Sequence, residues 1–313
     1  MNTSVESVTL DWKERAQRVA DGIRRRVLKH TILNNGGYLS QACSSAEIFA
    51  TLYTRVMKLG ESSAPLIPVD IPPVYQAANP IHFRGAEYNG PIQPEYDRFF
   101  VSPGHYALIV YATLVEIGRL SEEGLARFNK DGSTVEMIGA DHSPGFEVMS
   151  GSLAQALSVA GGVAHARKIK RESGRVWVFL SDGEMQEGQT WEAIAAMSFY
   201  QLDNIGVYVD VNRHQCDGRM EDVMKVEPLV ERLTSFGAIC ETVDGHDLEA
   251  LAAPASRLGQ GKPLFVLAYT DPCRGIPLLE GRRPFLHYVR FKSAEEKSAY
   301  EELYTKTYGD LES

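Results

Sequence analysis

The sequence predicts an α/β protein with a doubly wound, mostly parallel sheet and helices on both faces of that sheet. Three runs, RVWVFL, IGVYVDV and PLFVLAYT, are continuously apolar and rich in β-branched and aromatic residues. Such runs are typical of strands that are buried on both faces. Segments with helical spacing accompany them, such as TWEAIAAMSFYQL between the first two. Strands that alternate with helices build parallel sheets, which gives the predicted class.

The first elements are predicted to be helical. Residues 11–33 carry apolar side chains at helical spacing, and the glycine-rich stretch NNGGYLSQACSS follows them. Ser44 or Ser45 is the expected cap of a second helix, AEIFATLYTRVMKL. Residues 60–96 are rich in proline and glycine and lack periodicity, so we expect an irregular insertion there.

The next segments continue the alternation of strand and helix. DRFFV is predicted to be a short strand, followed by a tight turn at residues 102–105 and a helix in YALIVYATLVEIG. SGSLAQALSVAGGVAHARKI is predicted to be a helix opened by a Gly/Ser turn, and FGAICETVDG adds a later strand. A chain of 313 residues suits one large domain or two small ones. We expect a single domain over residues 1–313.

The composition argues against several classes of protein. The net charge is −9, from 32 Lys and Arg against 41 Asp and Glu, so a basic surface for nucleic acid is not expected. No apolar run is long enough to span a bilayer, and the N-terminal segment lacks the apolar core of a signal peptide. The four cysteines form no Cys-x-x-Cys pair, which indicates neither a zinc site nor a disulfide framework. We therefore expect a cytoplasmic protein that binds neither nucleic acid nor membranes.

Two predicted strands end close to side chains that can bind a cation. Asp182 comes just after RVWVFL, and Asn212 lies 30 positions later (212 minus 182), directly after IGVYVDV. This spacing matches one βαβ unit, so both side chains are expected at the carboxyl edge of the sheet, where ligands bind. One carboxylate and one amide oxygen suit Mg²⁺, which takes its other ligands from water and phosphates. Gly183 would let the backbone pass close to such a ligand. A structural interpretation stays open from spacing alone: Asp182 as a helix cap and Asn212 as a turn former.

The motif SDGEMQEG, followed by VDVNRHQCDG, resembles the thiamine diphosphate motif of the transketolase family. The resemblance implies the diphosphate-binding (PP) domain fold, with Asp182 and Asn212 as side-chain ligands of Mg²⁺, or of Ca²⁺ or Mn²⁺ in its place. It implies that the backbone carbonyl of His214 completes the protein ligands. Gly183 and Glu184 would belong to the cofactor-binding turn. By the same resemblance Glu187, the glutamate of this motif, is expected at a subunit interface.

The resemblance extends to other segments of the chain. DRFFVSPGH resembles a family segment whose histidine contacts the diphosphate, which implies this role for His105. PGFEVMSGSLAQALSVAGGVA resembles the segment whose Gly-Ser-Leu turn lies against the thiamine, here Gly151, Ser152 and Leu153. His287, in RPFLHYVRF, stands where the family tends to carry another active-site histidine near the diphosphate.

The chain also departs from the family pattern. Ser181 replaces the usual first glycine of the metal motif, and Tyr38 stands where transketolases carry a histidine that faces the substrate. Tyr38 can donate a hydrogen bond but is no base at neutral pH, which argues against an ordinary pentose phosphate substrate. Tyr38, His105 and His287 are expected to take part in catalysis, and Tyr38 and His287 are expected to line the donor channel. The other histidines carry less weight: the role of His142, near a family Gly-His-Pro, stays open, and structural roles are expected for His30, His82, His165 and His246.

The resemblance covers only the diphosphate-binding half of a transketolase, which is about twice as long as this chain. In the family, the glutamate that activates the aminopyrimidine of thiamine diphosphate belongs to the other half. We therefore expect the N-terminal subunit of a split transketolase, joined to a separate C-terminal subunit in an α2β2 assembly. The expected reaction is two-carbon ketol transfer from a ketose to an aldehyde, with thiamine diphosphate and the metal ion as cofactors.

Three other functions are weighed against this one. The segment GGY followed by SSAEIFATLY also resembles the E1 component of 2-oxoacid dehydrogenases, so such a component, or a related thiamine-dependent carbon–carbon lyase, is the nearest alternative. A non-catalytic scaffold subunit is a second, although a scaffold would not need both Asp182 and Asn212. A nucleotide enzyme is disfavoured because neither a P-loop motif nor a Gly-x-Gly-x-x-Gly motif opening a helix is present.

Overall fold

The protein contains the predicted parallel sheet. A computed structural model describes residues 11–71 and 84–311 of the chain. Five strands lie side by side in the order β1-β2-β3-β7-β6, and every neighbouring pair is parallel. Their bounds are β1 Arg98–Val101, β2 Val176–Ser181, β3 Ile205–Val211, β6 Ile239–Asp244 and β7 Leu264–Tyr269. A short antiparallel ladder, β4 (His214–Gln215) and β5 (Gly218–Arg219), follows β3.

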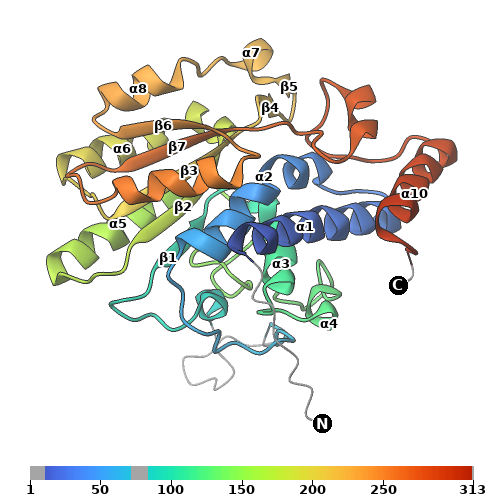
Figure 1. The fold of residues 1–313 in the computed structure, drawn as a ribbon, viewed down its shortest axis with the longest axis horizontal. Helices are drawn as coiled ribbons and strands as arrows, with labels where there is room; N and C mark the ends of the chain where they lie inside the picture. The colour runs from blue at the N-terminus through green and yellow to red at the C-terminus, as the bar shows by residue number, and fades with distance from the viewer. Residues whose placement is uncertain (1–10, 72–83, 312–313) are drawn as a thin grey trace, which may run out of the picture.

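Helices cover both faces of the sheet, which confirms the doubly wound α/β class (Figure 1). On one face lie α1 (Trp12–Asn34), α2 (Leu39–Thr51), α3 (Ala107–Glu116) and α9 (Leu248–Ala252). The other face carries α5 (Gln155–Lys170), α6 (Gly188–Phe199) and α8 (Leu229–Ser235). The last helix, α10 (Ala294–Tyr308), packs against α1. Two further α-helices are single turns, α4 (Glu122–Leu125) and α7 (Met220–Val223).

The strands read as continuous apolar runs because alternate residues enter two different cores. In β2, Trp177 and Phe179 pack with the α1–α3 side, whereas Val176, Val178 and Leu180 pack with the α5–α6 side. All six residues of β2 and all seven of β3 are buried. Each large apolar side chain buried in this way contributes about 1.5–3 kcal/mol. The two cores fix the register of the strands and hence the position of their carboxyl ends.

The start of the second helix differs from the prediction. Helix α2 begins at Leu39, so the expectation that Ser44 or Ser45 caps it is wrong. Both serines are buried inside the helix. Their hydroxyls are used elsewhere: Ser44 Oγ donates to Asp210 Oδ2 at 2.6 Å, and Ser45 Oγ donates to the carbonyl of Gln41 at 2.6 Å. Because these hydroxyls have partners within the fold, serine is tolerated at helix positions where it would otherwise favour a cap.

The described parts of the 60–96 segment are irregular. Their one helical piece is a 3-10 turn at Gly85–Asn89. The segment is tied to the domain through Arg119, whose guanidinium donates to the carbonyls of Tyr88 at 2.6 Å and Gly60 at 2.7 Å. His82 and its neighbours at 72–83 lie outside the described residues. Within the described ranges, no helix combines the length and the apolar character that crossing a membrane requires.

Candidate functional site

The two predicted metal ligands leave the sheet at one edge. Strands β2 and β3 pair in parallel with Ser181 beside Asp210, so Asp182 and Asn212 follow the ends of neighbouring strands. Both residues line one cavity of about 340 Å³, together with His214. The amide of Arg213 donates to Asp182 Oδ2 at 2.7 Å, which ties the end of β2 to the segment after β3. The sequence prediction that these residues meet at the carboxyl edge agrees with this geometry.

Asp182 has the electrostatic properties of a cation ligand. Its side chain is 2 % exposed. Burial raises the pKa of Asp182 well above its usual range, and the nearby carboxylate of Asp210 raises it further. Two buried carboxylates close together destabilise the charged state, and a bound divalent cation relieves that cost.

Asn212 forms a turn after β3, and its side-chain oxygen can still bind a cation. Its Oδ1 accepts a hydrogen bond from the amide of His214 at 2.9 Å, which is the turn-forming role that the sequence left open. Its Nδ2 donates to Asp210 Oδ2 at 3.2 Å. An amide oxygen has two lone pairs, so Oδ1 can accept this bond and still bind a cation. The turn therefore orients the amide and does not exclude the metal role.

Asp210 is a buried residue of the site that the sequence analysis did not single out. Besides Asn212, three hydroxyls donate to its carboxylate: Ser44 Oγ at 2.6 Å, Tyr106 OH at 2.8 Å and Thr270 Oγ1 at 2.6 Å. They come from α2, from the 3-10 turn Gly104–Tyr106 and from the position directly after β7. The only signal in the sequence is a charged residue within the apolar run IGVYVDV. The four donors hold Asp210 in one orientation, and Asp210 in turn orients Asn212.

The turn after β2 leaves room for a ligand. A Cβ atom added at Gly183 would meet no heavy atom of the described chain within 4 Å, and Gly183 lines the 340 Å³ cavity. Gly151, Leu153 and the exposed Glu187 line it as well. Ser152 and Glu184 are not among its described lining residues. The open space beside Gly183 is where a close backbone approach to a ligand is possible.

Glu184 instead braces three segments around the cavity. Its carboxylate accepts hydrogen bonds from the amide of Ala154 at 2.8 Å, from the amide of Ser181 at 2.9 Å and from the hydroxyl of Ser102. Ser181 and Glu184 form a capping box at the 3-10 turn Asp182–Gln186. The pattern Ser-x-x-Glu in the sequence carries this signal. The brace holds the turn at residues 151–154 against the ends of β1 and β2.

The three predicted catalytic side chains lie together. The ring centroid of Tyr38 is 5.3 Å from that of His105 and 5.5 Å from that of His287, and the two histidine rings are 4.9 Å apart. All three residues line the 340 Å³ cavity. Burial, with a smaller contribution from His287, lowers the pKa of His105 to about 3. Burial also lowers the pKa of His287 and raises that of Tyr38. At neutral pH the cluster therefore presents uncharged donors and acceptors.

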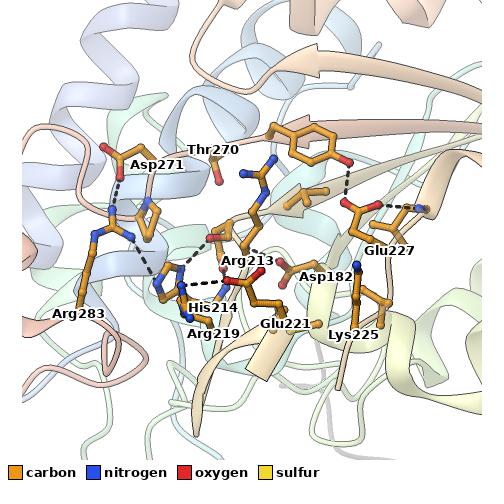
Figure 2. A pocket seen from close by; sticks show the side chains of 17 residues that line it. Asp182, Arg213, His214, Arg219, Glu221, Lys225, Glu227, Thr270, Asp271 and Arg283 are labelled. Carbon is orange, nitrogen blue, oxygen red and sulfur yellow. Dashed lines mark hydrogen bonds and ion pairs between the residues drawn. The ribbon is translucent and has the colours of Figure 1, made fainter. Parts of the chain in front are cut away.

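A second cavity, of about 750 Å³, adjoins the first and shares Asp182, Asn212 and His214 with it (Figure 2). The ring of His214 lies between two partners: its Nδ1 donates to the carbonyl of Asn212 at 2.9 Å, and Arg283 Nη1 is 3.3 Å from its Nε2. Arg283 also donates to Asp271 at 3.0 Å. These contacts hold the segment that follows β3, and the ligand predicted from His214 is its carbonyl.

Other histidines have partners away from the cavity. His142 Nε2 lies 2.9 Å from Glu136 Oε2, and His142 is not among the described residues that line the cavity. His246 lies between Glu47, 3.0 Å from its Nδ1, and the amide of Asp271, which donates to its Nε2 at 2.8 Å. His246 thus has the structural role that the sequence predicted. For His142 the geometry also favours the structural interpretation.

Comparison with known proteins identifies the family. The fold and the polar strand ends define a cofactor-binding α/β domain, and residues 61–285 match the family model described as "Transketolase, thiamine diphosphate binding domain". A transketolase family protein from Sinorhizobium fredii, itself uncharacterised, is 33% identical over 289 residues, covering 90% of this chain and 91% of that protein. The chain therefore belongs to the transketolase family and contains its thiamine diphosphate-binding domain.

Two further comparisons show how the chain relates to other members. A protein from Actinobacillus succinogenes, named as one subunit of an apulose-4-phosphate transketolase, is 30% identical over 92% of this chain and 95% of its own length. The crystal structure of transketolase from Campylobacter jejuni superposes with a TM-score of 0.76 at 21% identity. That match covers 99% of this chain but 44% of the Campylobacter chain, and it bears on the fold alone.

Proposed function

We propose that this chain binds the metal-bound diphosphate end of thiamine diphosphate and, with a separate C-terminal subunit, catalyses two-carbon ketol transfer from a ketose to an aldehyde. The observation that carries the proposal is the meeting of Asp182, Asn212 and His214 around one cavity in a member of the transketolase family. The protein would supply three metal ligands, namely one carboxylate, one amide oxygen and one backbone carbonyl, and phosphate and water would complete the coordination. Such a set suits Mg²⁺, and Ca²⁺ or Mn²⁺ can take the same ligands.

The residues around the cavity have distinct parts in this proposal. Asp182 and Asn212 hold the cation, and the open backbone at Gly183 admits the diphosphate. Thiamine diphosphate, when bound, supplies the carbon nucleophile that a protein side chain cannot provide. His105 and His287 stay neutral and donate or accept hydrogen bonds, and Tyr38 donates its hydroxyl hydrogen to a substrate oxygen. The chain's main contribution is thus to bind and orient the cofactor.

A separate partner subunit is part of the proposal. The chain spans less than half of the Campylobacter transketolase, whereas it spans nearly all of a relative whose name describes one subunit of a transketolase. We propose an α2β2 assembly in which exposed Glu187 lies at an interface between subunits. We also propose that the chain acts as one cofactor-binding domain in the cytoplasm. Its four free cysteines suit a reducing compartment.

The test combines cofactor titration with a donor screen. Calorimetry with thiamine diphosphate and Mg²⁺ should show binding to the chain or to its complex with the C-terminal subunit. Asp182→Asn should abolish that binding, whereas Asp203→Asn, at a half-buried carboxylate that pairs with Lys168 and does not line the 340 Å³ cavity, should leave it unchanged. If neither the chain nor the complex binds the cofactor, the scaffold interpretation holds instead.

The activity of the complex separates the remaining alternatives. Ketol transfer that requires both subunits supports the proposal. Robust ketol transfer by this chain alone would contradict the split arrangement. Decarboxylation of a 2-oxoacid without any ketose activity would identify an E1-type component.

A further inference from the structure

A buried glutamine contacts one of the predicted catalytic histidines through two atoms. Gln41 lies on α2, three positions after Tyr38, and is 4 % exposed. Its Nε2 is 2.9 Å from the backbone carbonyl oxygen of His287 and 3.1 Å from Nδ1 of the same residue. Both Gln41 and His287 line the 340 Å³ cavity. The amide therefore occupies one side of the imidazole ring, next to the cofactor site.

These contacts determine which ring nitrogen carries the proton. A backbone carbonyl can only accept a hydrogen bond, so the side-chain atom of Gln41 that faces it is nitrogen. The amide oxygen lies on the other side, 2.9 Å from the hydroxyl oxygen of Ser40. The second hydrogen of the same NH₂ group points to Nδ1 of His287, which must then accept. A neutral imidazole whose Nδ1 accepts carries its proton on Nε2.

We propose that Gln41 is a positioning residue that holds His287 as the neutral Nε2–H tautomer. The ring then offers the cavity a hydrogen-bond donor and cannot act there as a base. A suitable partner is an oxygen that accepts, such as a phosphate oxygen or the hydroxyl or carbonyl oxygen of a sugar. This consequence for the ligand rests on the proposed function, whereas the tautomer itself does not. The lowered pKa of His287, caused by burial and opposed by Asp217, agrees with a neutral ring.

The chain holds a matched control for this geometry. At the end of α1, Asn34 Nδ2 lies 2.9 Å from the carbonyl oxygen of His30 and 3.1 Å from His30 Nδ1. Asn34 is exposed, and neither residue is among the described lining residues of the 340 Å³ cavity. The same argument assigns His30 the Nε2–H tautomer. His30 thus reports whether an amide in this position sets a tautomer at a ring outside the 340 Å³ cavity.

The direct test is nitrogen-15 NMR of the full chain with labelled histidine. The signal of His287 is identified by its absence from the spectrum of His287→Gln. At neutral pH the wild-type spectrum should show a protonated Nε2 and an unprotonated Nδ1 at both His287 and His30. A proton on Nδ1 of His287 would overturn the proposal. This measurement needs no cofactor and no partner, so its failure is distinct from failure of the proposed function.

Two substitutions show whether Gln41 is the cause. Gln41→Leu removes the donor and should give a mixture of tautomers at His287, while Gln41→Glu should reverse the tautomer because a carboxylate accepts from Nδ1–H. Asn34→Leu should change His30 alone. An unchanged His287 signal in a Gln41→Leu protein with native circular dichroism would overturn the role of Gln41.

The consequence for binding is measured on the complex with the C-terminal subunit. Gln41→Leu should raise either the cofactor Kd or the ketose donor KM by about tenfold, as expected for the loss of one oriented hydrogen bond from His287. A rise in the cofactor Kd would assign the His287 donor to a phosphate oxygen, and a rise in the donor KM with unchanged cofactor Kd would assign it to the sugar. Asn34→Leu should change neither quantity. Equal cofactor Kd and donor KM in Gln41→Leu and wild type would contradict the proposed consequence.

Discussion

The open turn at Gly183 gives the sharpest test of the cofactor site, because stability and binding should change in opposite directions. Gly183 does not have a positive φ, and a Cβ there would meet no described heavy atom within 4 Å. Alanine therefore fits the folded protein, and Gly183→Ala should raise the free energy of unfolding by about 0.4–1 kcal/mol through the unfolded state. The added methyl group would stand in the cavity. Crowding a filled site in this way costs about 1–3 kcal/mol, so cofactor affinity should fall about 5-fold to 150-fold.

The assay compares urea denaturation with calorimetric titration of thiamine diphosphate and Mg²⁺. A matched control is Gly162→Ala, at an exposed position in the middle of α5, where an added Cβ also meets no described heavy atom within 4 Å. It should stabilise the chain by a similar amount and leave cofactor affinity unchanged. If Gly183→Ala binds the cofactor as tightly as wild type, the diphosphate does not approach this turn, and the assignment of the cavity is wrong.

Three further predictions concern the buried polar groups and pH. Asp210→Ala leaves four donors without their acceptor and should lower the free energy of unfolding, measured by urea denaturation, by about 3–5 kcal/mol. Asp210→Asn should keep most of that stability. A loss below about 1 kcal/mol for Asp210→Ala would refute the role of Asp210 as the shared acceptor of these four donors. Glu184→Gln places an NH₂ group against a backbone amide and should lower the free energy of unfolding by about 1–3 kcal/mol in the same assay. A free energy of unfolding equal to that of wild type would show that the hydrogen bonds of Glu184 do not contribute to stability. Burial lowers the pKa of His30 to about 4 and of His105 to about 3. Since the unfolded chain binds these protons below about pH 6.5 and the folded chain does not, each histidine should lower stability as pH drops from about 6.5 towards 4, by at most about 1.4 kcal/mol per pH unit. Asp182, whose raised pKa favours protonation of the folded chain, acts in the opposite direction, so the histidine contribution is read from the difference between wild type and His30→Leu. Wild type should lose stability relative to His30→Leu over this range, and a constant difference between the two would contradict the buried neutral state of His30.

The sheet could be predicted because its physical cause is visible in short stretches of sequence. A strand buried on both faces needs apolar side chains at every position, and β2 and β3 meet that need almost without interruption. The start of α2 could not be found in the same way. Ser44 and Ser45 favour a cap by their local chemistry, but Ser44 donates to a carboxylate that is 166 positions away in the sequence. Only the folded structure brings that partner to the helix.

The residues of the candidate site also differ in whether the local sequence could predict them. Asp182 and Asn212 could be predicted because each follows the end of its own strand, and parallel strands end at a common edge. Gln41 and Asp210 could not. Gln41 acts on His287 across 246 positions, and the hydroxyl partners of Asp210 lie on three separate elements. A local motif reveals the residues at strand ends, whereas residues that orient them depend on long-range contacts.

The carboxylate of Asp210 would link cofactor affinity to complete folding under the proposed function. Its donors come from segments that begin near residue 44 and end at Thr270, so Asn212, the proposed metal ligand, is oriented only after both ends of that span have assembled. A fragment that stops before β7 would contain Asp182, Asn212 and His214, yet it would leave the asparagine amide without its full support. Under the proposed function, such a fragment should bind the cofactor more weakly even though every predicted ligand is present.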